Sequence, residues 1–591
     1  DRVRSAVVDE AQHDDVALLR RFEPILRFNE GELFLPAAVD DYVRRCELFR
    51  REPGGRRQLL APKGSLTLEL LADIGATHPR PGQYLRFVDE PFTRAQLAWW
   101  RLRGDRPKFH GASRLARVGV MSRGIDALSR ASLLFRGKVV AGTEAAAETQ
   151  YRTEMRPEHH PYYGRVLRDG GYTVLQYWYF YVFNDWRSRV YGVNDHEADW
   201  EQVTIYLAER DGELEPAWIV SSAHDEVGDD LRRRWDDPDL TLVGEHPVIF
   251  PGLGSHSGAY LAGEYLTAYE GDAFGPMIRV SRKVSRTLLP WTRDHEHTGL
   301  SIPYIDYSRG DGVGIGVGEE RGWEPVVVDE TTPWVVHYRG LWGDDTQDPL
   351  GGERGPAGPR YERSAVVRTS WGDPVGWAGL RKVPAGSALG ADAVTARLEE
   401  LDAEIDELSN RIDRHAIRLQ AVVASGERVR GRDEADLATL SAERVALRDE
   451  RLVLGRALER DVVPPAPHDH LRHRRMPLPS ESTARRRVLA IWSALSTPFV
   501  LAMCAYFVIT PGWDTASFGV EIVLIVFAIE ALARRQLVRF ALLVIAALAA
   551  LWVALFVAWA IIDDWRIAVA VPLAAVALAL TILNVRELVR D

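Results

Sequence analysis

The alternation of apolar and polar positions predicts strands over most of the first 387 residues. Short runs in which every second residue is apolar are separated by Gly, Pro and Asp turns, so one face of each run is suited to a core. Such spacing predicts an antiparallel β-sandwich over residues 1–387. Residues 96–148 are richer in Ala, Leu and Arg and predict a helical insertion. The clearest runs are Tyr172–Phe183, Trp200–Leu207, Ala217–Ser222, Pro247–Phe250, Pro325–Val328 and Trp334–Tyr338.

A different period follows in residues 391–461. Apolar residues recur at alternating spacings of three and four, as at Leu401, Ile405, Leu408 and Ile412, which is typical of a coiled-coil seam. The stretch "SGERVRG" in the middle predicts a turn, so the segment is expected to form a coiled-coil helical hairpin. Pairing within one chain is one interpretation, and a homo-oligomer through the same face is the alternative. Residues 462–485 are rich in Pro and Arg and predict a linker.

Long apolar runs fill residues 486–591. A bilayer-spanning helix needs about 20 apolar residues. The runs predict a region of four transmembrane helices, so the whole chain is expected to be multidomain. The predicted spans are Val488–Thr510, Phe518–Ala533, Phe540–Ile562 and Ile567–Leu583.

Arginines flank these runs unevenly. They precede the first run, lie between the second and third, and follow the fourth. The positive-inside rule then predicts an integral protein of the cell membrane with four spans, its termini and its β-sandwich all cytoplasmic. Glu521 and Glu530 lie near the ends of the second run, which favours interfacial placement. A pore through an oligomer is the alternative.

Composition excludes few functions. The formal net charge of −11 argues against a general nucleic-acid binder, which would need a basic face. Two cysteines far apart in the sequence do not suggest a disulfide framework.

The stretch "NDHEADWEQVTIYL" contains a histidine and several carboxylates just ahead of an apolar run, and it is the main candidate for a functional site. If it is extended, Asp199 and Glu201 share a face with three core-type residues. A hairpin with the preceding aromatic run would bring Asp185 beside His196 at one strand end. Burying unpaired carboxylates is strongly unfavourable, and a divalent cation would resolve it. Oxygen-rich ligands with one imidazole favour Mg, Ca or Mn.

Two other interpretations of that stretch stay open on the residues alone. The carboxylates could pair with Arg187 or Arg189, or the stretch could be an exposed turn. Elsewhere, Ser255 and His256 lie in the Gly-rich "GLGSHSGAY", where they could face the cation or bind a polar ligand. His224 follows a predicted strand and is a further candidate for ligand binding.

Four segments in order resemble a known family. "FEPILRFNEGELFLP", "DHEADWEQV", "PVIFPGLGSHSGAY" and "VVHYRGLWGDD" with the following "GPAGP" are similar to segments of the vacuolar protein sorting-associated "sixty-two" family. "DHEADWE" also resembles the "GHRHDWE" heptapeptide of the necrosis-and-ethylene-inducing cytolysins. Together the matches cover about residues 22–380, interrupted by the helical insertion.

The resemblance implies a β-sandwich with a divalent-cation site. The first His, the Asp and the Glu of the heptapeptide fall on His196, Asp199 and Glu201. The upstream Asp of the cytolysins falls on Asp185 only with a gap, and their second His is Ala198 here. In the cytolysins the cation serves recognition of lipid head groups rather than turnover.

These observations predict a membrane-anchored protein in contact with lipid. Its cytoplasmic β-sandwich would bind a divalent cation and a polar ligand, such as a lipid head group or a sugar. One alternative is an oligomeric membrane channel or scaffold with the β-sandwich as a cap. Another is a metal-dependent hydrolase with Glu201 or His256 as base.

Overall fold

The computed structural model divides the chain into two compact units. The first comprises residues 1–111 and 125–480, and the second residues 112–124 and 481–591. We describe each unit by itself. The structure describes residues 14–52, 55–77, 82–105, 107–109, 123, 141–185, 195–210, 212–222, 231–269, 302–344, 355–382, 391–425, 431–459, 475–478, 483–510, 512–534, 537–563 and 566.

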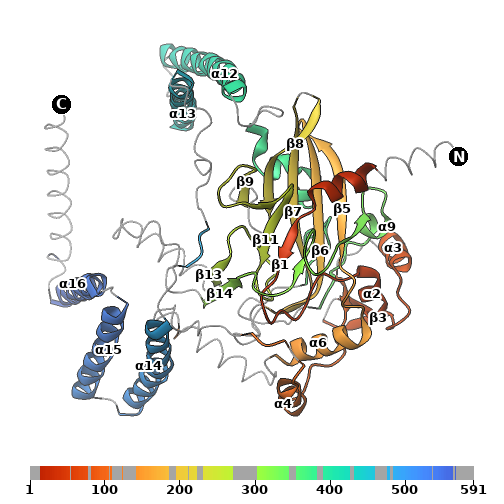
Figure 1. The fold of residues 1–591 in the computed structure, drawn as a ribbon. Coiled ribbons are helices and arrows are strands. Elements are labelled where there is room, and N and C mark those ends of the chain that lie inside the picture. Colours follow the sequence, from red (N-terminus) through yellow and green to blue (C-terminus); the bar gives the residue numbers. More distant parts are fainter. Residues whose placement is uncertain are drawn as a thin grey trace, which may run out of the picture. The chain divides into compact units, whose positions relative to one another are not determined.

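A six-stranded sheet forms the centre of the first unit (Figure 1). Its order is β16-β5-β6-β7-β8-β9, in which β16 runs parallel to β5 and every other neighbour is antiparallel. The strands are β16 (Glu324–Val327), β5 (Pro161–Asp169), β6 (Tyr172–Asn184), β7 (His196–Arg210), β8 (Glu213–Ser221) and β9 (Arg232–Arg234).

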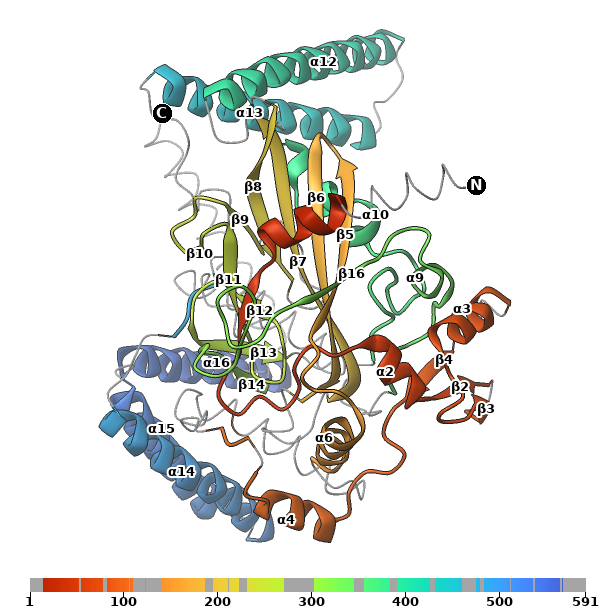
Figure 2. The ribbon, with the colours of Figure 1, turned by 45° about the vertical axis from the view of Figure 1, so that its right-hand side comes forward.

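Strand β6 is buried along its whole length, which explains its nearly continuous apolar sequence. Tyr177, Tyr179 and Tyr181 pack in a core with residues of β1, β7 and β11. The alternate residues, such as Trp178 and Phe180, pack in a second core with α2 (Val39–Arg44) and α6 (Gly142–Glu154). Figure 2 shows α2 and α6 at one end of the sheet.

A five-stranded sheet lies beside the first one. Its path is β10-β11-β1-β15, with β12 paired to β11, and β1 runs parallel to β11. Two smaller sheets have the orders β3-β2-β4 and β13-β14. The strands are β1 (Ile25–Arg27), β10 (Thr241–Val243), β11 (His246–Pro251), β12 (Gly258–Ala259), β15 (Gly314–Ile315), β2 (Glu47–Arg51), β3 (Arg57–Ala61), β4 (Gln83–Arg86), β13 (Gly263–Tyr269) and β14 (Ile302–Ser308).

The predicted antiparallel β-sandwich is therefore wrong. The two largest described sheets are mixed, because β1 pairs in parallel with β11 and β16 pairs in parallel with β5. Helices α2 and α6 pack against one face of the central sheet. Alternation reports which side chains share a face, and it carries no information about which distant strand becomes the neighbour.

The other described helices of the first unit are short, apart from two near its C-terminal end. Helix α4 begins with a capping box, in which Thr93 and Gln96 satisfy each other's backbone N–H groups. It lies at one end of the predicted insertion and α6 at the other. Residues 106, 110–122 and 124–140 lie outside the described part. The helices are α3 (Leu68–Thr77), α4 (Arg94–Leu102), α9 (Pro333–His337), α10 (Thr369–Gly372), α11 (Pro374–Trp377) and the 3₁₀ helix η5 (Leu380–Lys382).

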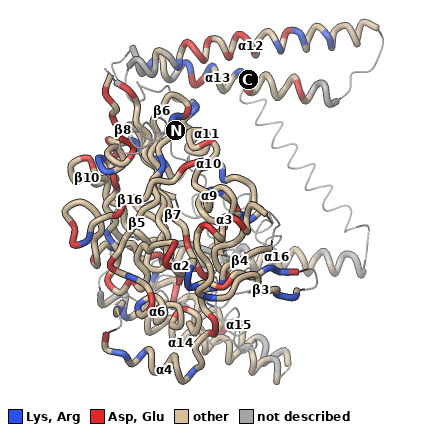
Figure 3. Tube along the Cα trace, turned by 90° about the vertical axis from the view of Figure 1, so that its right-hand side faces the viewer, with Lys and Arg blue, Asp and Glu red and all other residues tan. Residues whose placement is uncertain are grey.

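Two long helices, α12 (Ala391–Ala424) and α13 (Gly431–Glu459), pack against each other. Arg397, near the start of α12, binds Glu450, near the end of α13, so the two helices run antiparallel. The seam buries Leu401, Ile405 and Leu408. Charged residues of both signs recur along α12 (Figure 3).

The second unit contains α14 (Thr483–Ile509), α15 (Trp513–Ala533) and α16 (Leu537–Asp563). Among the described residues, one helix is long and apolar enough to cross a membrane by length and composition, Arg487–Phe507. Residues 540–556 form a shorter apolar helix. The prediction of four transmembrane helices is therefore wrong, and with it the localisation derived from four spans. The fourth predicted run, residues 567–583, lies outside the described part.

Glu530 of α15 shows why an apolar run is not always a lipid-facing span. Its side chain is buried and accepts hydrogen bonds from Arg123 at 2.6 and 3.0 Å and from Arg534 at 2.9 Å. Arg123 also donates to Ser493 and Ser496 of α14. Glu530 is thus buried and paired within the unit, whereas Glu521 is exposed, and the interfacial placement of both stays a prediction.

Candidate functional site

The start of β7 departs from regular strand geometry. In the register with β6, Asn184 lies opposite His196 and Tyr181 opposite Asp199. Between them, Ala198 has a φ of 61°, in the left-handed region that side chains with a Cβ rarely adopt. The side chains on its two sides consequently point to different cores. Glu197 contacts β4 and its following residues, while Asp199 faces the turn after β11.

Asp199 is held by two donors. Its Oδ2 accepts hydrogen bonds from Asn184 Nδ2 at 3.1 Å and from His256 Nδ1 at 2.9 Å. The other ring nitrogen of His256, Nε2, lies 3.7 Å from Glu32 Oε1. The three side chains are almost completely buried. His256 therefore lies between the carboxylates of Asp199 and Glu32, which are far apart in the sequence.

The charge state of His256 follows from these neighbours. Burial lowers its pKa, but the hydrogen bond to Asp199 and the negative charges of Asp199 and Glu32 outweigh burial and raise the pKa from 6.5 to about 10. The ring also stacks on Tyr181, with centroids 3.7 Å apart and an interplanar angle of 3°. At neutral pH an imidazolium thus supplies the positive charge that two buried carboxylates require.

His256 belongs to a tight turn, Gly252–His256, that follows β11. His256 itself has a φ of 56°, a second departure from ordinary backbone geometry beside Asp199. Ser255 Oγ donates to Asp306 Oδ1 at 2.8 Å. Gly254 must be glycine, because its φ is +71° and a Cβ would lie 2.0 Å from Asp185 Oδ1.

The predicted cation ligands do not form one cluster. His196 Nδ1 lies 2.7 Å from the carbonyl oxygen of Ala198, and Glu201 accepts from Ser222 Oγ at 2.9 Å. Asp185 lies against Gly254, and Asp199 binds His256. Within the described ranges, no three His, Cys, Asp or Glu side chains are arranged to hold a metal.

As placed, these residues do not fit the cation site that the sequence predicts, so the cation remains a prediction. Its role as a counter-charge to Asp199 is taken by His256. His224 lies outside the described residues. The proposed ion-pair partners Arg187 and Arg189 also lie outside them.

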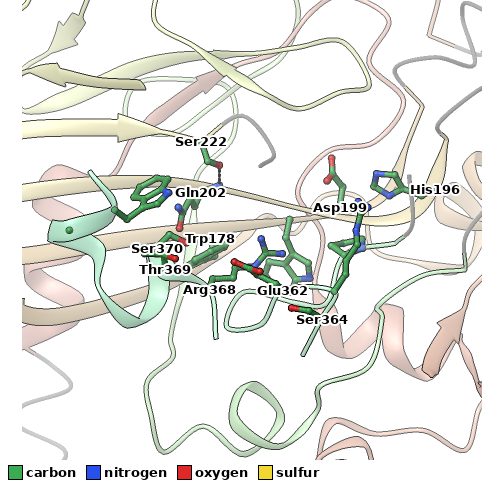
Figure 4. A pocket seen from close by; sticks show the side chains of 15 residues that line it. Trp178, His196, Asp199, Gln202, Ser222, Glu362, Ser364, Arg368, Thr369 and Ser370 are labelled. Atoms are coloured by element: carbon green, nitrogen blue, oxygen red, sulfur yellow. Dashed lines mark hydrogen bonds between the residues drawn. The ribbon is translucent and has the colours of Figure 1, made fainter. Parts of the chain in front are cut away.

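A cleft of about 680 Å³ opens beside the same stretch of β7. Figure 4 shows His196 and Asp199 toward one end and Gln202 and Ser222 toward the other. The opposite wall comes from the segment Pro356–Trp377. The lining residues are Trp178, His196, Asp199, Trp200, Gln202, Ser222, Pro356, Glu362, Arg363, Ser364, Arg368, Thr369, Ser370, Gly376 and Trp377.

The wall segment contains a small hairpin at the rim of the cleft. Tyr361 bridges to Val367, and the turn is closed by a hydrogen bond from the Ala365 N–H to the Glu362 carbonyl. Ala365 has a φ of 63°. Of the four described non-glycine residues with positive φ, three, Ala198, His256 and Ala365, thus lie in or next to the cleft, and such strain is concentrated at functional sites.

Glu197, next to the strained Ala198, attaches the start of β7 to the segment that follows β4. Its carboxylate accepts from the backbone N–H groups of Phe87 and Val88, both at 2.8 Å, and of Asp344 at 3.3 Å. Burial raises its pKa from 4.5 to about 7, against the lowering effect of these donors.

Several residues around Asp199 and the cleft could not be identified as site residues from the sequence. Glu32 lies in "NEGELFLP", an acidic turn in one of the segments that carry the resemblance, but its partner His256 is 224 positions away. Trp200 lies next to Asp199 in β7. It contacts Tyr163 and Trp342, and it also lines the cleft. No local signal indicated the wall Pro356–Trp377.

Comparison with known proteins adds no relative. No family model matches the chain, and neither the curated proteins nor the solved structures give a match. The resemblance to the "sixty-two" family and the cytolysins therefore remains a prediction.

Proposed function

We propose that the first unit binds a small, neutral, polyhydroxylated ligand of the sugar class in the cleft between β7 and Pro356–Trp377. The observation that carries the proposal is the composition of the lining. The half-buried Trp377 lines the cleft together with side chains that both donate and accept hydrogen bonds, and the nearly buried Trp178 and Trp200 add apolar surface to its wall. Aromatic surface with a few placed polar groups is what small-molecule sites use, and sugars present both kinds of surface.

The charges of the lining favour a neutral ligand over a phosphorylated head group. Asp199 and Glu362 are acidic, whereas Arg363 and Arg368 are basic. The two carboxylates balance the two guanidinium groups, so these charges give no net attraction for a phosphate, while hydroxyl groups can bind either kind of side chain. The hydrolase alternative has less support, because His256 is engaged by Asp199 and Glu201 accepts from Ser222.

Replacing the half-buried Trp377 by alanine is expected to weaken sugar binding at least tenfold, since stacking surface is lost from the rim. Trp99→Ala is the matched control, because Trp99 is 75% exposed on α4 and does not line the cleft. Binding is measured by calorimetry and tryptophan fluorescence against a panel of neutral mono- and oligosaccharides and inositol phosphates.

The outcomes separate the possible ligands. Binding of neutral sugars that Trp377→Ala weakens and Trp99→Ala leaves unchanged supports the proposal. Binding of inositol phosphates alone would make the cleft an anion site instead. If no compound of the panel binds at millimolar concentration, the proposal fails.

We also infer that membrane lipid contacts α14. Large apolar side chains of this helix are exposed within the second unit, among them Ile491, Leu495 and Phe499. Contiguous exposed apolar surface of this kind marks protein or membrane interaction sites.

Leu495→Asp is expected to lower the fraction of full-length protein that stays with phosphatidylcholine vesicles after an alkaline wash. A carboxylate in the middle of a lipid-embedded helix costs about 3 kcal/mol. Ile417→Asp on α12 is the control, since Ile417 is 65% exposed and Leu495 66%. Wild-type protein that the wash removes from the vesicles would contradict lipid insertion. The oligomeric channel or scaffold stays an untested alternative.

A further inference from the structure

The end of the linker before α14 is docked on the β13–β14 hairpin of the first unit. The Leu478 N–H donates to the Glu264 carbonyl at 2.7 Å, at the edge of β13. Pro477 lies directly over Gly263, where a Cβ would come within 2.4 Å of Pro477 Cβ. We call residues Arg475–Leu478 the strap. It ends five positions before Thr483, the first residue of α14.

Arg475 anchors the other end of the strap. Its guanidinium lies 3.3 Å from Asp306 Oδ2 and 5.0 Å from the centroid of the Tyr265 ring. The Asp306 side chain is only 4% exposed, so this ion pair is largely removed from solvent on the carboxylate side. Such a pair specifies a position more than it adds stability.

Asp306 also holds the turn Gly252–His256. Its Oδ1 accepts from Ser255 Oγ at 2.8 Å, and the Leu253 N–H donates to the Tyr307 carbonyl at 2.8 Å. The packing is tight, because a Cβ on Gly252 would lie 2.1 Å from Asp306 Oδ1. One carboxylate therefore joins the strap to the turn.

The turn Gly252–His256 also contacts a residue of the cleft. His256 follows Ser255 directly, stacks on Tyr181 and binds Asp199, which lines the cleft. Interactions with defined geometry thus run without a break from Arg475 through Asp306 to Asp199. Closely packed polar groups of this kind shift together, because moving one leaves its buried neighbour unsatisfied.

We propose that seating of the strap and the position of Asp199 are coupled through the turn Gly252–His256, so that occupancy of the cleft biases the linker that leads into α14. In the seated state the Leu478–Glu264 and Arg475–Asp306 contacts are formed, and in the released state both are broken. The effect of occupancy rests on the proposed function. The coupling itself does not, and it must act equally in both directions.

Hydrogen exchange of the full-length protein tests the coupling without any ligand. Arg475→Gln is expected to speed exchange of the Leu478 amide about tenfold, and of the Leu253 and His256 amides about fivefold. Ser255→Ala is expected to speed exchange at Leu478 about fivefold, because Asp306 loses the donor that fixes its orientation.

Arg309→Gln is the matched control. Arg309 directly follows β14, pairs with Glu264 and stacks on Tyr307, so its replacement removes a cation from the same hairpin without touching Arg475 or Asp306. It should leave the Leu253 and His256 amides unchanged. The coupling is overturned if Arg475→Gln frees Leu478 while both turn amides keep their wild-type rates, or if the wild-type Leu478 amide is unprotected. A failure of sugar binding would affect neither result.

Discussion

Replacing His256 by asparagine is expected to lower the free energy of unfolding by about 4 kcal/mol at pH 7. The imidazolium lies between Asp199 and Glu32, and its replacement removes a positive charge from beside two buried carboxylates and a donor from Asp199. Asparagine tolerates the left-handed backbone at this position, so the loss reports the ring and not the turn. Urea denaturation of the full-length protein measures it.

The pH dependence distinguishes this role from simple packing. The pKa of His256 is about 10 in the folded state and 6.5 when unfolded, so the folded protein holds the proton more tightly. Its stabilisation is complete below pH 6.5 and is lost as the pH rises toward 10, by about 1 kcal/mol per pH unit. His256→Asn should lack this slope between pH 7 and 9. A slope that the variant retains would show that another group is responsible.

Two comparisons sharpen the result. His246 is only half-buried and binds the Glu23 carbonyl through Nδ1 at 2.9 Å, so His246→Asn should cost no more than about 1 kcal/mol. Combining His256→Asn with Asp199→Asn should cost less than the sum of the two changes, because the second removes one of the stranded charges. Additive effects would contradict the ion bridge.

Glu197→Ala is expected to cost about 3 kcal/mol, because it leaves backbone N–H groups of Phe87, Val88 and Asp344 without their acceptor. The control is Glu245→Ala, which breaks only the exposed pair with Arg21 and should cost less than about 1 kcal/mol. Chemical denaturation at several pH values measures both.

The loss should be larger in acid. The pKa of Glu197 rises from 4.5 in the unfolded chain to about 7 in the folded protein. Its contribution is therefore greatest below pH 4.5 and declines as the pH rises to 7, by about 3 kcal/mol in total. The difference between wild type and Glu197→Ala should consequently be greater at pH 5 than at pH 8. An equal difference at both would show that the carboxyl is not titrating as described.

The sequence predicted local features better than distant partners. Alternation correctly placed Val203, Ile205 and Leu207 in one core, and the aromatic run does pair with the strand that carries Asp199. Both conclusions depend on side-chain direction within a strand, which a short window contains. The parallel pairing of β1 with β11 and of β16 with β5 depends on packing between residues that are distant in the sequence. A short window contains no information about such packing, and the prediction of an antiparallel sandwich was wrong for this reason.

The site illustrates the same limit. The stretch from His196 to Glu201 drew attention because buried carboxylates need a counter-charge. A cation was the general solution that spacing could suggest. The cation remains a prediction, and the structure places His256, from a distant turn, against Asp199 and places Ser222 against Glu201. The long apolar runs likewise predicted membrane-spanning helices. The sequence of such a run does not indicate that Glu530 binds Arg123 inside the second unit.

The bond between Arg123 and Glu530 joins residues 407 positions apart. At roughly 5–20 residues per second, a ribosome needs on the order of 20–80 s to synthesise the chain between them. During that interval Arg123 has been made but its carboxylate partner has not. The helical unit therefore cannot be completed until α15 has been translated, and a nascent chain that stalls before α15 would leave Arg123 without this buried partner.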